Sequence, residues 1–390
     1  MPRLLILSVA GVLSLLPASL FAQDTPPDKS VPAGVWVRPG YKLTVAAVLE
    51  DKPRFLCFGP DGTLFVSHPG VGSISILRGL DSNGFYQQVS EFVSDMDKVQ
   101  AMQWVDGELW FARSGSIYKA KLGADGKAAD IQTIIPEGQL PKDGGHWWRS
   151  LLIYKGRLYT SIGDPENLSD QTATDREKIW SYDLKGGDKK LFISGIRNTE
   201  KLVVRPGTDE IWGMDHGSDW FGKPVGDKVG MQPITDLNPP DEMNHYVQDN
   251  FYGHPFIVGN KIPRYEFMNR PDIIELADKT VPPEWGTPAH WAPNAMCFYD
   301  AKQFPSLYGD AFVAFHGSWN RKVKAGYQVA RVLFEDGHPY GQLPMVKFLD
   351  DQGNVLGRPT DVAVAPDGSL LISDDYRAPG YIYRLTYVGK

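Results

Sequence analysis

Hydrophobic and polar residues alternate in a hairpin pattern that recurs six times along the chain. In each copy an apolar run leads into a short polar turn, often Asp-Gly or Lys-Gly, and a second apolar run follows. A turn of this kind between alternating runs indicates a β-hairpin, because glycine adopts the positive φ that the turn needs without steric cost. The residues that align after the six turns are Leu64, Leu109, Leu158, Ile211, Phe312 and Leu370.

The spacing of the copies predicts the architecture. Most neighbouring copies are separated in the sequence by about the length of a propeller blade, which is roughly 40 to 50 residues. One interval is about twice as long. The sequence therefore predicts an all-β fold, a six-bladed β-propeller, over residues 41–390 with an insertion around residues 212–290. Strand-like patterns at both ends of this region are expected to share one blade, which closes the ring and removes exposed edges.

The hairpin geometry brings ionisable residues to one face of the ring. In an antiparallel hairpin, the start of the first strand and the end of the second strand lie at the same edge. The ionisable and amide residues at these positions are His68, Arg113, Asp215, His316, Asp374, Arg54, His146, Arg149, Arg197, Asn198, His290 and Arg358. We expect a functional site on this face; the alternative is that blade edges are polar only because water solvates them.

The N-terminus has the features of a targeting segment. Arg3 precedes an apolar run that ends in small residues, the pattern of a secretory signal peptide over residues 1–22, and the Pro-rich residues 23–40 form a tail. We therefore expect a periplasmic or secreted protein. No other segment approaches the roughly 20 apolar residues of a membrane span. The net charge of −7 argues against a nucleic-acid partner.

Two cysteines bear on the redox chemistry. Cys57 and Cys297 occupy equivalent positions in repeats that are not neighbours, so a disulfide between them is hard to build and free thiols are expected. The chain has no CxxCH motif and so no covalently attached haem.

An acidic segment rich in glycine and proline lies between the fourth and fifth copies. Its carboxylates belong to Asp215, Asp219, Asp241, Glu242 and Asp249. Carboxylates and free carbonyls in irregular backbone suit calcium, which takes about six to eight oxygen ligands. We expect a calcium site in residues 212–260, on the same face as His146, because this segment continues from the strand end at Asp215. A solvated acidic loop is the alternative.

Arginines form the basic part of the same face, although the chain is negative overall. Those at or near predicted strand ends are Arg54, Arg149, Arg197, Arg321, Arg358 and Arg377. Guanidinium groups bind carboxylates in a bidentate fork, so their convergence predicts a ligand with more than one carboxylate. Each arginine taken alone is as well explained by a surface ion pair.

His146 is the candidate base. It lies between Gly144-Gly145 and Trp147-Trp148. Desolvation by aromatic neighbours, with arginines nearby, disfavours the charged imidazolium and leaves a neutral ring that can accept a proton. A histidine that only hydrogen-bonds a loop is the alternative.

Five segments together resemble a known family. They are GGHWWRS, SGIRNTEKLVVRPGTDEIWGMDHG, PPDEMNHYVQDNFYGHP, AFHGSWNR and GRPTDVAVAPDGSLLISDD. Their order and spacing are similar to those of soluble pyrroloquinoline quinone (PQQ) dependent sugar dehydrogenases, especially the sorbosone dehydrogenase-like branch. The similarity covers about residues 40–386. It implies a six-bladed propeller on which the quinone lies flat over the axial face and is polarised by calcium.

The resemblance also implies roles for individual residues. His146 would be the general base and Arg197 would assist it. The implied cofactor contacts are Arg149, Arg197, Asn198, His216, Arg321, Arg358 and Asp374. The implied ligands of the cofactor calcium are the backbone oxygens of Gly217 and Ser218, with Asp219 also among the metal residues, and Asp241, Glu242 and Tyr252 would lie near a structural calcium. The chain departs from the family at Thr199 and Glu200, where a carboxylate would repel an anionic cofactor, and at Arg321 or Lys322, which stands in place of a cofactor-contacting lysine.

The expected activity follows from the resemblance. The enzyme would oxidise a hydroxyl or hydrated aldehyde of a sugar by hydride transfer to the quinone, and an external acceptor, a quinone or a cytochrome, would take the electrons. The tryptophans expected to stack on the sugar are Trp147, Trp148, Trp220 and Trp319. Two alternatives remain open: a calcium-dependent propeller lactonase, which would need few arginines, and a non-catalytic propeller that binds a glycan or protein.

Overall fold

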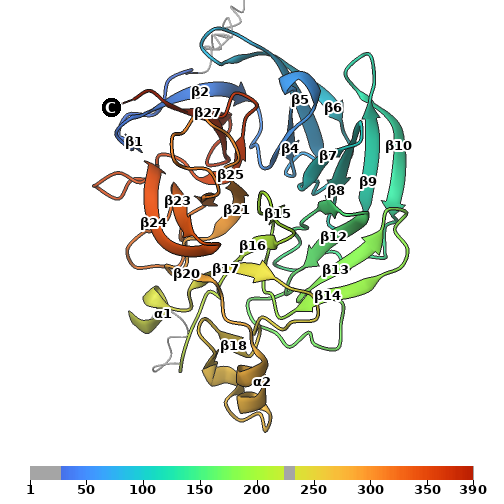
Figure 1. Ribbon diagram of the computed structural model, residues 1–390, viewed down its shortest axis with the longest axis vertical. Coiled ribbons are helices and arrows are strands. Elements are labelled where there is room, and N and C mark those ends of the chain that lie inside the picture. Colours follow the sequence, from blue (N-terminus) through green and yellow to red (C-terminus); the bar gives the residue numbers. More distant parts are fainter. Residues whose placement is uncertain (1–27, 224–232, 390) are drawn as a thin grey trace, which may run out of the picture.

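Six antiparallel sheets surround a common axis in the computed structural model, which describes residues 28–223 and 233–389 (Figure 1). The prediction of a six-bladed β-propeller is confirmed. The expected signal peptide, residues 1–22, lies outside the described residues.

The first three blades each consist of four strands that follow one another in the chain. The first blade contains β3 (Leu56–Phe58), β4 (Leu64–His68), β5 (Ser73–Leu80) and β6 (Tyr86–Val93). The second contains β7 (Met102–Val105), β8 (Glu108–Ala112), β9 (Ile117–Leu122) and β10 (Ala128–Ile135). The third contains β11 (Leu152–Tyr154), β12 (Arg157–Ile162), β13 (Lys178–Asp183) and β14 (Lys190–Ser194).

The other three blades carry the insertion and the chain ends. The fourth blade contains β15 (Leu202–Val204), β16 (Ile211–Asp215), β17 (Asp241–Tyr246) and β20 (Trp285–Thr287). The fifth contains β21 (Pro293–Phe298), β22 (Ala311–Phe315), β23 (Gln328–Glu335), β24 (His338–Lys347) and an added outer strand, β1 (Trp36–Val37). The sixth contains β25 (Pro359–Val364), β26 (Leu370–Asp374), β27 (Gly380–Tyr387) and β2 (Tyr41–Leu49).

Strands from the two ends of the chain close the ring. β2 pairs with β27 from Tyr41 opposite Tyr387 to Leu49 opposite Gly380, so the predicted shared blade is confirmed (Figure 1). At the neighbouring interface, Phe312 of the fifth blade packs in one buried cluster with Val362 of the sixth.

The predicted hairpins form the inner strands of the blades. Leu64 begins β4 and Leu370 begins β26, each after a turn whose glycine, Gly62 or Gly368, has a φ of 72° or 83°. The two cysteines are free, as expected, and burial raises the pKa of both thiols to about 12.

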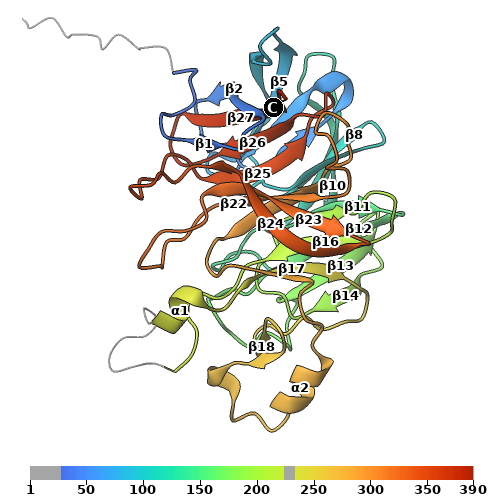
Figure 2. The same ribbon diagram turned by 60° about the vertical axis from the view of Figure 1, so that its left-hand side comes forward.

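The insertion extends the fourth blade outward from the ring (Figure 2). It contains α1 (Pro233–Leu237), β18 (Ile257–Val258), β19 (Ile262–Pro263) and α2 (Ile273–Lys279). Its outer part has a small core of its own, in which Phe256 and Ile257 pack on Ile273 and Ala277. Neither α1 nor α2 has the length and apolar character to cross a membrane.

Candidate active site

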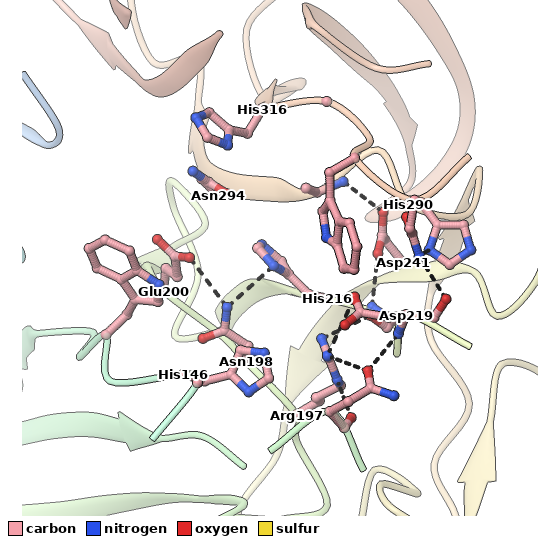
Figure 3. Close-up of a pocket in the computed structure, with 18 of the residues that line it drawn as sticks. His146, Arg197, Asn198, Glu200, His216, Asp219, Asp241, His290, Asn294 and His316 are labelled. Atoms are coloured by element: carbon pink, nitrogen blue, oxygen red, sulfur yellow. Dashed lines mark hydrogen bonds and ion pairs between the residues drawn. The ribbon is translucent and has the colours of Figure 1, made fainter. Parts of the chain in front are cut away.

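The predicted convergence of polar strand ends produces a cavity of about 430 Å³ on one face of the propeller (Figure 3). Five of the six blades contribute to it, at the starts of their first strands or the ends of their second strands. The ionisable and amide residues that line it are Arg54, His146, Glu166, Asn167, Arg197, Asn198, Glu200, His216, Asp219, Asp241, His290, Asn294, His316, Asn320 and Arg358.

His146 is held in one tautomer. Its Nδ1 lies 2.7 Å from the backbone carbonyl oxygen of Asp164. A carbonyl can only accept, so Nδ1 carries the proton and Nε2 is left as a lone-pair acceptor. Burial, and then the positive charge of Arg197, hold the pKa of His146 well below its ordinary value. The ring is therefore neutral at physiological pH, as a general base requires.

Arg197 bridges the loop before β13 and the insertion. Its Nε and Nη2 donate to the backbone oxygen and Oδ1 of Asn167, at 2.8 and 2.9 Å, and its Nη1 donates to the Gly217 carbonyl at 2.9 Å. The arginine is buried, so these contacts fix the guanidinium. The Gly217 carbonyl, implied by the resemblance to bind calcium, faces this guanidinium instead.

An ion-pair network crosses the other side of the cavity. Arg54 donates to Glu200 Oε2 at 2.9 Å and to Asp375 Oδ2 at 3.0 Å. Glu200 Oε1 accepts a hydrogen bond from Asn198 at 3.2 Å, and Asp375 Oδ1 lies 2.7 Å from His316 Nε2. Arg54 therefore provides Glu200 with a counter-charge that it shares with Asp375, which reduces the repulsion expected between Glu200 and an anionic ligand.

The charge of Asp375 is supported by the same network. Burial opposes its ionisation, but His316 and Arg54 together hold the pKa of this carboxyl below its ordinary value. Desolvation lowers the pKa of His316, although Asp375 opposes that shift. Asp375 was not among the site residues identified from the sequence.

Two further polar groups are directed at the cavity. The buried Nδ2 of Asn294 has no hydrogen-bond partner among the described residues, so it is a donor available to a ligand. Arg358 spans the carbonyl oxygens of His316 and Gly317, at 3.1 and 3.2 Å, and also lines the cavity. Asn294 has no local sequence signal that could have identified it.

Two of the four tryptophans expected to bind sugar line the cavity. The Trp148 ring lies 4.0 Å from the Arg54 guanidinium carbon, and Trp319 is 66% exposed at the mouth. Trp147 stacks on Trp148 and Trp220 packs edge-on against Trp319, both outside the lining.

Three of the implied cofactor residues do not reach the cavity. Arg149 donates to the carbonyls of Trp148, at 2.7 Å, and Pro141, and burial lowers its pKa to about 9. Arg321 reaches only the Ala289 carbonyl, at 3.4 Å, and Asp374 accepts from the backbone of Arg358. None of these three side chains lines the cavity in the structure, so their implied cofactor contacts stay predictions. Successive side chains of an extended chain point in opposite directions. Here the neighbour Trp148 lines the cavity, and the neighbour Asp375 binds Arg54 and His316, which line it.

Three of the implied metal residues also lie behind the cavity. Ser218 Oγ accepts from Arg264 Nη1 at 2.7 Å, Glu242 Oε1 accepts from the Gly259 amide at 2.7 Å, and Tyr252 donates to the His245 carbonyl at 2.6 Å. None of these three side chains lines the cavity, and the implied backbone contact of Ser218 and the implied structural calcium near Glu242 and Tyr252 stay predictions.

Asp219 and Asp241 do line the cavity. Both oxygens of Asp241 accept backbone amides, from Gly217 at 2.8 Å and Ala292 at 3.0 Å, while burial raises its pKa. The nearest cation to Asp219 is Arg197, 3.8 Å away. Three arginines face four carboxylates around the cavity, so an anionic ligand would bind here most favourably together with a cation.

Comparisons with known proteins identify the family and the fold of this chain. A family model described as TrAA12-like matches residues 35–387. The chain belongs to the TrAA12-like family. An uncharacterised protein of Borreliella burgdorferi is 24% identical to this TrAA12-like chain over 355 residues, which is 86% of each chain.

Two solved structures show the same fold as this TrAA12-like protein. An iodide structure of a Trichoderma reesei carbohydrate-active enzyme of family AA12 has a TM-score of 0.79 at 18% identity, and covers 93% of this chain and 100% of its own. The holo form of the PQQ domain of a pyranose dehydrogenase from Coprinopsis cinerea has a TM-score of 0.74 at 18% identity, with 90% and 97% covered.

Proposed function

We propose that this TrAA12-like protein is a sugar dehydrogenase that uses PQQ and calcium. The observation that carries the proposal is the neutral His146, with its Nε2 free, at a cavity into which arginines and amides converge. The similarity to the PQQ domain of a pyranose dehydrogenase and to a calcium-containing family AA12 structure supports the choice of cofactors.

The residues present fit such a cofactor. The cavity is within the size range of small-molecule sites, and the orphaned Nδ2 of Asn294 is a donor for a ligand oxygen. Arg54, Asn198, Asn294 and Arg358 would hold the quinone, and Asp219 would hold calcium. When bound, the quinone accepts a hydride and calcium polarises it.

The chain's own residues supply the proton chemistry and the positioning. His146 Nε2 accepts the proton of the sugar hydroxyl, and the Asp164 carbonyl keeps the ring in the tautomer that can do so. Arg197, fixed between Asn167 and Gly217, disfavours a long-lived imidazolium and so favours release of the proton. Trp148 and Trp319 offer aromatic surface for the sugar ring.

The proposal extends to the partners and the compartment. The sequence has no covalent haem motif, so the electrons leave to a separate acceptor, a quinone or a cytochrome. The signal-peptide pattern supports a periplasmic or secreted location.

Reconstitution tests the function. The purified protein is mixed with calcium and PQQ, and a panel of sugars is assayed with a dye as electron acceptor. Sugar-dependent dye reduction together with a visible absorption band of the bound quinone supports the dehydrogenase. Hydrolysis of lactones without quinone would support the lactonase, and sugar binding without either reaction would support a binding propeller.

A further inference from the structure

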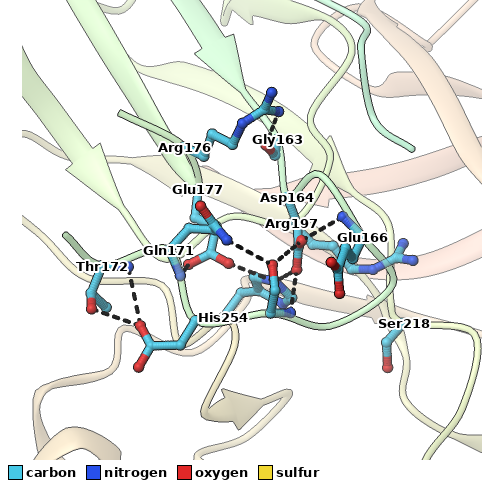
Figure 4. Close-up of polar contacts among 12 residues, drawn as sticks. Gly163, Asp164, Glu166, Gln171, Thr172, Arg176, Glu177, Arg197, Ser218 and His254 are labelled. Atoms are coloured by element: carbon cyan, nitrogen blue, oxygen red, sulfur yellow. Dashed lines mark hydrogen bonds and ion pairs between the residues drawn. The ribbon is translucent and has the colours of Figure 1, made fainter. Parts of the chain in front are cut away.

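A second polar cluster, formed by Asp164, Glu177 and His254, lies in the protein interior (Figure 4). The backbone oxygen of Asp164 links this cluster to His146. His254 Nε2 lies 2.8 Å from Asp164 Oδ2 and 3.5 Å from Glu177 Oε1, and one ligand atom from each residue lies within 4.8 Å of the others. All three side chains are at most 7% exposed. Asp164 and Glu177 flank the loop between β12 and β13, and His254 belongs to the insertion.

The cluster lacks a cation of its own among the described residues. Arg176 Nη2 donates to the carbonyls of Lys142 and Asp143, at 2.9 and 3.1 Å. The Lys178 ammonium is held by four carbonyls of the same loop, at 2.6 to 3.2 Å, from Gln171, Thr172, Thr174 and Arg176. Neither side chain forms an ion pair with Glu177, although the charge of Lys178 acts on it from farther away. Asp164 also accepts hydrogen bonds from Glu166 and Ser169, so Glu177 is the carboxylate of the cluster that is least satisfied.

One oxygen of the cluster is left without a hydrogen bond. Glu177 Oε1 is buried and has no hydrogen-bond partner within residues 28–223 and 233–389, while Oε2 accepts only the Gln171 amide at 3.3 Å. A buried carboxylate oxygen without a donor costs free energy, so native proteins rarely keep one. Oε1 is directed at the space between Asp164 and His254, which is where a cation would satisfy it.

We propose that Asp164, Glu177 and His254 bind one divalent transition-metal cation, Zn²⁺ or Mn²⁺. Bonds of about 2.0–2.2 Å place neighbouring ligand atoms roughly 3 to 4 Å apart. The 3.5 Å between His254 Nε2 and Glu177 Oε1 lies in this range, and the 2.8 Å between His254 Nε2 and Asp164 Oδ2 would widen slightly when a cation replaces their hydrogen bond. One imidazole with two carboxylates suits Zn²⁺ or Mn²⁺, whereas calcium needs more oxygens. On binding, His254 releases its Nε2 proton to solvent, and the dication balances both carboxylates.

A cation bound by this cluster would help to hold His146 in position. The backbone oxygen of Asp164 fixes the tautomer of His146, and its side chain is a ligand of the proposed cation. A cation here therefore ties the turn that carries this carbonyl to the insertion. The inference does not depend on the quinone or the sugar, since metal binding is measured without either.

Metal analysis tests the proposal. The full protein is stripped with a chelator, dialysed, and titrated separately with Zn²⁺, Mn²⁺ and Ca²⁺ by calorimetry and thermal unfolding. We expect about one equivalent of Zn²⁺ or Mn²⁺ to bind and to raise the melting temperature by several degrees, with affinity that falls at acidic pH because His254 must lose a proton. Calcium should not substitute in raising the melting temperature through this site.

Variants identify the ligands. Glu177→Gln and His254→Gln should each weaken binding of the transition metal at least about tenfold. Asp175→Asn, an exposed carboxylate of the same loop that pairs with Lys189, is the matched control and should bind as the wild type does. If a variant does not fold, the metal titration of the stripped wild-type protein still tests the proposal. Absence of stoichiometric Zn²⁺ or Mn²⁺ binding, or equal binding by wild type and both variants, would overturn the proposal.

Discussion

The Arg54 guanidinium donates a 2.9 Å hydrogen bond to the Glu200 carboxylate, although 146 residues separate the two in the chain. Both side chains are buried, with 8% and 2% exposed. The pair joins the first blade to the segment before the fourth and provides a counter-charge for Glu200, which lines the cavity. Removal of one partner would leave a buried charge without a counter-charge.

The ion pair gives the first prediction. Arg54→Met should lower the free energy of unfolding by about 3–5 kcal/mol, because Glu200 and Asp375 would lose their shared partner. The double variant with Glu200→Gln should lose less than the sum of the two single variants. Urea unfolding measures both. Lys155→Met, which breaks the exposed ion pair with Asp209, is the control and should leave the free energy of unfolding unchanged. If the effects of the Arg54 and Glu200 substitutions simply add in the double variant, the two residues are not coupled.

The second prediction concerns the base. His146→Ala should lower turnover by about a hundredfold to ten-thousandfold, the usual contribution of a positioned general base, with quinone affinity nearly unchanged. Because burial and Arg197 lower the pKa of His146, wild-type activity should already be on its plateau at neutral pH and decline only in the acid range. Steady-state rates from pH 5 to 8 check this. His338→Ala, an exposed histidine, is the control, and an unchanged rate in His146→Ala would remove the base from the mechanism.

The third prediction concerns Asp374, whose pKa burial raises to about 6. The pKa of this carboxyl is higher in the folded protein than the value of 3.8 that it has in the unfolded chain. Its contribution to the free energy of unfolding is therefore complete below pH 3.8 and is lost as pH rises through about 6. Asp374→Asn keeps an oxygen to accept the amides of Arg358 and Tyr376. It should match the wild type near pH 4 and exceed it by on the order of 2–3 kcal/mol at pH 8. Equal differences at both pH values in denaturant unfolding would contradict it.

The fourth prediction concerns Lys178, whose ammonium donates hydrogen bonds to four carbonyls of the loop between β12 and β13. Lys178→Met leaves these oxygens without their donor, so the free energy of unfolding should fall by about 2–5 kcal/mol. Hydrogen exchange should rise first within residues 163–178. Lys189→Met, which loses a surface pair with Asp175 and a contact with the Trp180 ring but no carbonyl of the loop, should exchange as the wild type does. Uniform exchange in Lys178→Met would show that the ammonium does not organise the loop.

The fifth prediction concerns calcium at the cavity. Asp219→Asn should weaken calcium binding at least tenfold, because the carboxylate is the ligand type that calcium prefers. In the wild type, calcium at a hundredfold excess over its dissociation constant should add about 2.7 kcal/mol to the free energy of unfolding. Asp249→Asn, an exposed acid of the insertion, should retain wild-type affinity. Calorimetry that finds no calcium binding to the wild type would remove calcium from the proposed site.

The fold could be predicted from local sequence patterns, because each blade includes a hairpin whose turn and alternating apolar residues are short-range signals. The turn at Gly62 and the strand that begins at Leu64 are examples. The face of the site followed from the same geometry, which placed His146, Arg197 and Arg358 correctly.

The individual contacts were less predictable. Asp374 and Asp375 are adjacent, and a shift of one residue decides which of them faces the cavity network. Arg54, the partner of Glu200, belongs to another blade. Asn294 lines the cavity because the closed ring places the fifth blade beside it. Such pairings depend on tertiary proximity, which a single sequence does not encode in any short pattern.

The closure of the ring by β2 and β27 has a consequence for how the protein is made. A ring whose last seam joins residues 41–49 to residues 380–387 stays open until residue 387 has been synthesised. A premature stop just before β27 would leave the edges of β2 and β26 unpaired, and exposed strand edges promote aggregation. Small C-terminal truncations should therefore be as damaging to this protein as the deletion of an interior blade.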